Sequence, residues 1–169
     1  NVYSYYFSKY SHIWGWATWK RVWNKYDVNI SSWPQRKKEK LLSNVFDNKI
    51  DIYYWTSIFD EVYNNKIDTW DYQLTYTHFV NGLSAILPAA NLVSNIGFGK
   101  SKSTHTKHKS KFSNMETTEL QFPLRHPIEI VKNEESDKIT QRNNYPFWKY
   151  VFKKIFLKIN LTSSNFPSN

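Results

Sequence analysis

Residues 14–23 read Trp-Gly-Trp-Ala-Thr-Trp-Lys-Arg-Val-Trp and hold four of the eight tryptophans in this chain of 169 residues. A glycine between two tryptophans permits a positive φ or a close approach of another backbone. Trp19 and Trp23 are four residues apart, so they would share one face of a helix. The stretch therefore predicts a tight turn at Gly15 that leads into a helix over about residues 18–26.

Clustered tryptophans around a glycine turn have two common uses. They can form a wall against which a planar or pyranose ring stacks, with an indole N–H as a polar handle. They can also be part of the interior, because large apolar clusters usually identify a core. Composition alone favours the interior.

The overall composition limits the classes of protein that the chain can belong to. Its formal net charge is +9, with most of the basic excess beyond residue 100, and such a surface attracts phosphate in nucleic acid, lipid or nucleotide. The absence of cysteine excludes disulfides and thiolate chemistry and is typical of a cytoplasmic protein. No apolar run is long enough to span a bilayer. The chain begins inside an aromatic run without a signal peptide, so we expect a fragment of a longer protein.

Alternation and helical periodicity predict most of the elements. Strands are expected at residues 3–7, 84–87 and 91–96. Helices are expected from Trp33-Pro34 onward, from an N-cap at Asp51, and from residues 67–73 to Val80 with Asn81-Gly82 as the stop. Residues 97–110 form a polar loop, and residues 119–144 are loosely patterned. Two regions follow, residues 1–144 as a domain part and residues 145–169 as a basic amphipathic helix with a tail.

Three separated stretches carry a family resemblance, namely residues 5–19 around the Gly15 turn, Asp68-Thr69-Trp70-Asp71-Tyr72-Gln73, and residues 91–106. Their order and spacing resemble the C-terminal half of bacterial GT-A-type nucleotide-diphospho-sugar transferases, of the family 2 or haemolysin-like kind. The second stretch is similar to the Trp-Asp element of the N-acetylglucosaminyltransferase I type. The resemblance implies an α/β fold, a GT-A-like mixed sheet flanked by helices, of which this chain is the acceptor-side half.

The resemblance also implies a set of site residues. The substrate-binding positions would be Trp14, Gly15, Trp16, Trp70, Gln73, Ser94, Asn95, Gly97 and Phe98. Asp71 would be the catalytic base, and His105 would contribute to a metal site. A divalent metal, Mn or Mg, would be held mainly by an acidic motif that the family carries in its N-terminal half and that has no counterpart here.

Asp71 has a chemical argument of its own. It falls in the first turn of a helix, where free N–H groups and the helix dipole favour an ionised carboxylate. It could instead be a helix cap, although Asp68 and Thr69 already offer that function. Together with the resemblance, the surplus acid favours general base catalysis on an acceptor hydroxyl.

His105 and the basic C-terminal segment leave alternatives open. The imidazole of His105, among four lysines, could bind a metal or a pyrophosphate oxygen, or could be a plain loop residue. Residues 146–159 would form a helix with apolar residues on one face and lysines on the other. This pattern is typical of a helix at an anionic membrane surface but also of a helix docked on a core.

We therefore predict a glycosyltransferase of the hexosyltransferase type, active in surface polysaccharide or glycan synthesis. It would work in the cytoplasm, at the inner face of the cytoplasmic membrane, on a nucleotide-sugar donor and a glycan or lipid-linked acceptor. The alternatives are a non-catalytic carbohydrate-binding module and a basic nucleic-acid-binding module. Nucleic acid is not expected as a partner, because the tryptophans follow helical spacing and no RNA-binding module is recognisable.

Overall fold

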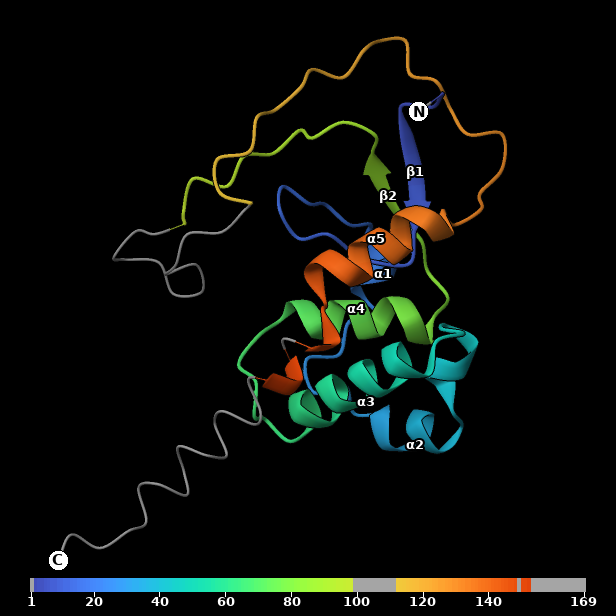
Figure 1. Ribbon diagram of the computed structural model, residues 1–169. Helices are drawn as coiled ribbons and strands as arrows, with labels where there is room; N and C mark the ends of the chain where they lie inside the picture. Colours follow the sequence, from blue (N-terminus) through green and yellow to red (C-terminus); the bar gives the residue numbers. More distant parts are fainter. Residues whose placement is uncertain (1, 99–111, 149, 153–169) are drawn as a thin grey trace, which may run out of the picture.

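The computed structural model of the chain describes residues 2–98, 112–148 and 150–152, and these form an α/β fold. The elements in chain order are β1 (Tyr5–Ser8), α1 (Lys20–Trp23), α2 (Trp33–Lys38), the 3-10 helix η1 (Leu41–Asn44), α3 (Lys49–Tyr63), α4 (Asp71–Val80), β2 (Ala85–Pro88) and α5 (Glu134–Asn144). In Figure 1 the strands lie at one end of the molecule and α2 at the other, with α4 and α3 between them. The sheet and the helices therefore form successive layers.

Helix α3 supplies the centre of the interior. The predicted stripe of apolar residues on this helix is confirmed, because Trp55, Ile58, Phe59 and Val62 are all buried. The predicted cap at Asp51 is wrong. The extended backbone of Asn48 lets its side chain accept a hydrogen bond from the Ile50 amide at 2.9 Å, so the helix begins one turn earlier.

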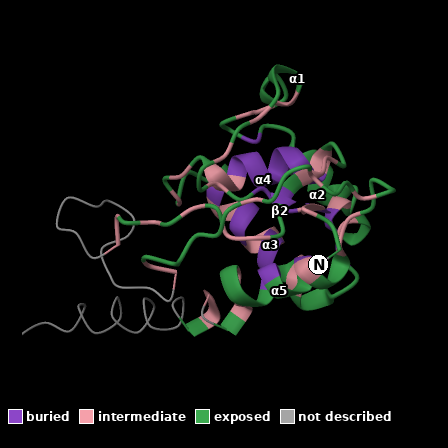
Figure 2. Ribbon diagram, turned by 90° about the horizontal axis from the view of Figure 1, so that it is seen from above, coloured by how far each residue is buried: buried purple, intermediate pink, exposed green. Residues whose placement is uncertain are grey.

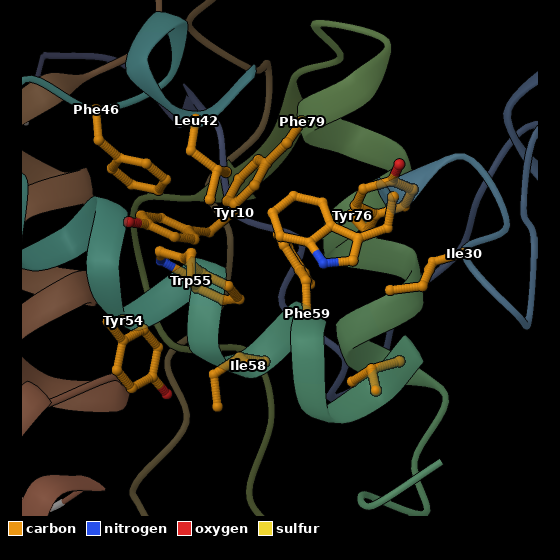
Figure 3. Close-up of a cluster of buried hydrophobic side chains, with 12 residues drawn as sticks. Tyr10, Ile30, Leu42, Phe46, Tyr54, Trp55, Ile58, Phe59, Tyr76 and Phe79 are labelled. Carbon is orange, nitrogen blue, oxygen red and sulfur yellow. The ribbon is translucent and has the colours of Figure 1, made fainter. Parts of the chain in front are cut away.

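The core between α3 and α4 is built mostly from aromatic rings (Figure 3). The Trp55 ring stacks on Phe46 with planes 9° apart, and it meets Phe79 of α4 edge to face at 5.3 Å. Phe59 meets Tyr76 in the same edge-to-face manner at 5.2 Å. Such offset and T-shaped pairs are the arrangements that aromatic quadrupoles favour.

Helix α4 ends where the sequence predicts. Its last residue is Val80, and Asn81 follows as the C-cap. Gly82 then has a φ of +61°, a backbone conformation that glycine reaches without the steric cost of a Cβ. This turn sends the chain into β2.

The two strands pair in antiparallel register, with Tyr6 opposite Leu87 and Ser8 opposite Ala85. Both strands were predicted, and the sheet that the described residues form has these two strands alone. The other side of β1 contacts the segment before α5, because the Asn133 amide donates to the Phe7 carbonyl at 2.8 Å. The early and late parts of the chain thus meet at β1.

Helix α5 lies in the stretch that the sequence left without a regular pattern. Its three buried residues are the polar Asp137, Thr140 and Gln141, so it has no apolar stripe to detect. Polar bonds hold it instead, since the Ser8 hydroxyl donates to Asp137 Oδ1 at 2.5 Å. Gln141 Oε1 accepts from the Tyr10 hydroxyl at 2.6 Å and from the Trp55 indole at 3.0 Å.

Three further predictions need correction. The helix after the Gly15 turn covers only Lys20–Trp23. The helix from Trp33 stops at Lys38, because Lys40 takes a φ of +55° and a separate 3-10 turn follows. Residues 91–96 are not a strand, since their pairing is limited to one bridge from Asn95 to Ser113.

The described part of the C-terminal segment is helical at residues 147, 148 and 150–152. Phe147 packs against Tyr53 of α3, and the Tyr150 hydroxyl lies 3.1 Å from Glu61 Oε1, whereas Trp148 is exposed. The first turn of the predicted amphipathic helix therefore docks on this chain's own core. Across the described residues, no helix has the length and apolar character needed to cross a membrane.

Candidate functional site

The Gly15 turn brings the first and third sequence motifs together. Gly15 has a φ of +60°, and a Cβ placed on it would lie 2.7 Å from Cγ2 of Val93. The adjacent Trp14 ring meets Phe98 edge to face, with centroids 5.8 Å apart. A glycine is needed here both for the backbone conformation and for the close approach of residue 93.

Trp16 joins this turn to the second motif. Its indole stacks on that of Trp70, with centroids 5.2 Å apart and planes inclined at 25°. Trp16 also contacts Trp23 at 6.1 Å, and Trp23 lies parallel to Tyr26 at 4.8 Å. The Tyr26 hydroxyl completes this ring of contacts by donating a hydrogen bond to the Trp70 carbonyl at 3.2 Å. We call these four residues, Trp16, Trp23, Tyr26 and Trp70, the aromatic quartet.

Composition alone predicted that the tryptophan-rich stretch belongs to the core, and this prediction is wrong. Trp14, Trp19 and Trp23 are 39%, 50% and 46% exposed, whereas the tryptophans of the interior are Trp33 and Trp55. Figure 2 shows α1 standing away from the buried centre of the molecule. Exposed aromatic side chains gathered around one turn are typical of a binding surface.

Asp71 lies at the first position of α4, directly after Trp70 of the quartet. Its Oδ1 is held by two donors, the Thr69 hydroxyl and the Tyr72 amide, the latter at 2.9 Å. Its Oδ2 accepts no hydrogen bond from any residue that the structure describes. Protein donors thus fix one carboxylate oxygen, and the other is the candidate proton acceptor.

The surroundings of Asp71 bear on its alternative function as a helix cap. Asp68 is exposed, and the Thr69 hydroxyl is committed to Asp71, so among the described contacts neither accepts a helix amide. Asp71 itself accepts the Tyr72 amide, so it does satisfy one free donor of the helix. The same carboxylate, together with that of Asp27, adds to the effect of burial in raising the pKa of the Tyr26 hydroxyl.

Gln73 is placed inside the fold rather than at the surface. Its side chain is buried, and its Nε2 donates to the Thr69 carbonyl at 2.6 Å. Its Oε1 is buried and has no hydrogen-bond partner among the described residues. Gln73 therefore positions the loop that carries Thr69 and Trp70.

Of the four substrate-binding positions predicted in the third motif, Phe98 alone has a contact with the site among the described residues. Phe98 contacts Trp14, and Gly97 donates its amide to Asn95 Oδ1 at 2.9 Å, which shapes the turn before it. The carbonyl of Asn95 accepts from the Asn114 amide, while Ser94 is exposed. Val93, which the sequence did not single out, makes the decisive contact with Gly15.

The predicted metal ligand, His105, lies outside the described residues. Among residues 2–98, 112–148 and 150–152 no three acidic or histidine side chains gather into a set that could hold a metal ion. The described part of the site therefore does not fit a divalent metal by itself.

The arrangement can hold a ring against aromatic edges and can accept a proton at one carboxylate oxygen. Tyr26 is a member that sequence reasoning missed, although its position three residues after Trp23 was a usable signal. Compared with models of protein families, with curated proteins and with solved structures, the chain matches none.

Proposed function

We propose that this chain is the acceptor-side part of a GT-A-type glycosyltransferase, with a mixed sheet completed by residues other than those described. It would transfer a sugar from a nucleotide-diphosphate donor to an acceptor hydroxyl. The observation that carries the proposal is the convergence of three separated motifs. Val93 packs on Gly15 and Trp70 stacks on Trp16, with Asp71 directly beside the stack.

The aromatic quartet supplies a wall for a sugar ring. Trp23 and Trp70 remain partly exposed, so their rims are open to a ligand. Pyranose rings present C–H faces to aromatic surfaces and hydroxyls to polar handles, and indoles offer both. Positioning of this kind is a large part of what an active site contributes to rate.

Asp71 supplies the proton acceptor. As the acceptor oxygen forms its bond to the anomeric carbon, the bond from that carbon to the diphosphate breaks, and the hydroxyl proton passes to Asp71 Oδ2. The bonds from Thr69 and Tyr72 to Oδ1 hold the carboxylate in place during this step. The family resemblance implies a divalent metal that would neutralise the leaving diphosphate.

The test is release of nucleoside diphosphate from a panel of nucleotide sugars by the whole protein, with Mn or Mg and a glycan acceptor present. Asp71→Asn should lower turnover by roughly 10²–10⁴-fold, the range for loss of a general base. Asp68→Asn is the matched control, because Asp68 is an exposed acid three residues away in the same motif. Equal turnover of the two variants would remove Asp71 from the chemistry.

A carbohydrate-binding module without catalysis would give a different pattern. The quartet would retain glycans in affinity electrophoresis, Asp71→Asn would bind as the unaltered protein does, and no nucleotide sugar would be consumed. That outcome would show that the function is glycan binding and not sugar transfer.

A further inference from the structure

The segment that contains α1 is exposed on almost every side. In residues 19–25 only Val22 is partly covered, and α1 buries none of its residues. Figure 2 shows this segment projecting from the body of the molecule. We call residues 19–25 the α1 protrusion. Trp23 packs on Trp16 and Tyr26, whereas the exposed ring of Trp19 serves no contact in the interior.

The α1 protrusion is also uniformly basic. It carries Lys20, Arg21 and Lys25, and the chain has no acidic residue before Asp27. Within the described part of the chain, none of these three cations forms an ion pair. Asp27 itself is occupied, because its two carboxylate oxygens accept the Asn29 and Ser31 amides at 2.9 and 2.6 Å. The charge of the α1 protrusion is complementary to an anionic partner.

The contacts of the tryptophan rings help to distinguish an acidic glycan from an anionic lipid surface as the partner of the α1 protrusion. Trp19 lies outside the aromatic quartet, and the Arg21 guanidinium lies over its ring at 4.9 Å. An acidic sugar that stacked on Trp19 would need an open ring face, and this cation covers one face of it. A lipid headgroup region needs only amphipathic rings beside cations, the combination that tryptophan with lysine or arginine provides at membrane interfaces.

We propose that the α1 protrusion binds an anionic membrane interface, with Trp19 at the level of the headgroups and Lys20, Arg21 and Lys25 against lipid phosphates. This surface does not depend on transfer activity. It lies next to the aromatic quartet, which contains Trp23, so membrane contact would bring the site close to the bilayer surface.

The proposal also assigns the membrane contact to a different part of the chain from residues 146–159. In Figure 2, α1 and α5 lie on opposite sides of the molecule, and residues 147–152 follow α5. Phe147 and Tyr150 of that segment pack on α3. A flat surface that touches the α1 protrusion would therefore not touch these residues.

The experiment is co-sedimentation of the full chain with vesicles of phosphatidylglycerol and phosphatidylcholine, and with vesicles of phosphatidylcholine alone. Lys20→Glu/Arg21→Glu should reduce binding to the anionic vesicles by roughly 20-fold, given the usual gain from each cation near an anionic surface. The matched control is Lys38→Glu/Lys66→Glu, which changes the net charge equally at two exposed lysines elsewhere. The control should bind nearly as the unaltered protein does.

Two further variants keep the test independent of folding effects. Lys25→Glu should weaken binding several-fold, and Trp19→Ala should weaken binding to anionic vesicles even when salt screens the charges. Equal loss in the Lys20/Arg21 variant and in the control would show that net charge alone drives binding and would overturn the proposal. Equal binding to neutral and anionic vesicles would also overturn it.

The alternative partner, an acidic glycan, is tested with a soluble acidic polysaccharide, polygalacturonate. The proposal expects its retention in affinity electrophoresis to be unaffected by Lys20→Glu/Arg21→Glu relative to the control. Loss of polysaccharide retention with vesicle binding unchanged would assign the α1 protrusion to an acidic glycan instead of a membrane.

Discussion

The indole of Trp70 lies on that of Trp16, with centroids 5.2 Å apart, and Asp71 follows Trp70 as the first residue of α4. The stack ties the start of this helix to the Gly15 turn. The position of the carboxylate therefore depends on a ring contributed by a distant part of the chain. This dependence can be tested separately from the chemistry of the carboxylate.

Trp16→Ala should lower turnover and also raise KM for the acceptor, because it removes both a wall of the site and the support of Trp70. A small displacement of a catalytic group can cost about 10²-fold in rate. Steady-state kinetics of the whole protein will show the split between kcat and KM. Trp148→Ala, a change at an exposed tryptophan outside the three motifs, should leave both constants unchanged.

Gly15→Ala and Gly82→Ala form a matched pair for stability. Both glycines have a φ near +60°, but a Cβ on Gly15 would meet Val93, whereas a Cβ on Gly82 meets nothing within 4 Å. Gly82→Ala should therefore cost about 1 kcal/mol from backbone strain alone, and Gly15→Ala about 1–3 kcal/mol more from overpacking. Urea denaturation measures both values.

The Val93 contact can be removed to check the cause. In Gly15→Ala/Val93→Ala the steric part of the loss should be recovered and the backbone part should remain. If Gly15→Ala and Gly82→Ala are equally stable, the close approach of Val93 to the turn is not present in solution.

His78 should make the fold sensitive to acid. Burial first, and then the charge of Lys132, lower the pKa of His78 from 6.5 to about 4, and its Nδ1 has no partner among the described residues. The folded state thus favours the neutral ring. Its stabilisation is complete above pH 6.5 and is lost as the pH falls from 6.5 towards 4, by about 3 kcal/mol in all.

The measurement is the free energy of unfolding as a function of pH, for the unaltered protein and for His78→Leu. The variant should lose the part of the slope between pH 6.5 and 4 that His78 contributes. His126→Gln, at an exposed histidine, is the control and should keep that slope. Parallel curves for the unaltered protein and His78→Leu would contradict the prediction.

Asp137 should be a main support of α5. Its carboxylate is buried and accepts the Ser8 hydroxyl at 2.5 Å and the Lys9 amide at 3.2 Å. Asp137→Ala leaves a buried and a partly buried donor unpaired, so we expect a loss of about 2–4 kcal/mol. Asp47→Ala, at an exposed acid, should cost little. Thermal unfolding of the two variants compares them directly, and similar melting temperatures would show that α5 is held by other contacts.

The sequence predicted the elements whose cores are apolar. The stripe of Trp55 and Phe59 on α3, the stop at Gly82 and the strand after it are all confirmed. Period and turn chemistry suffice for such elements because burial of apolar faces drives them. Helix α5 escaped prediction because its inward residues, such as Asp137 and Gln141, are polar and bind through hydrogen bonds.

The sequence predicted several residues of the candidate site but not how they are arranged in space. Trp16 and Trp70 do stack beside the Gly15 turn, and Trp14 meets Phe98 there, but nothing in the spacing of these residues distinguishes a surface cluster from a core. Gln73 follows the same motif and is buried, because its side chain turns back to the Thr69 carbonyl. The contact of Val93 with Gly15 depends on tertiary packing, which periodicity does not encode.

The bonds from Gln141 to Tyr10 and Trp55 have a consequence for the order of folding. The hydrogen-bonded residues Tyr10 and Gln141 lie near opposite ends of the described chain, whereas α3 and α4 are neighbours in sequence. Local contacts close small loops and form early, and distant pairs form late. During synthesis the α3–α4 hairpin can therefore assemble first. The polar groups of β1 and Tyr10 can form their hydrogen bonds to α5 only after α5 has been synthesised.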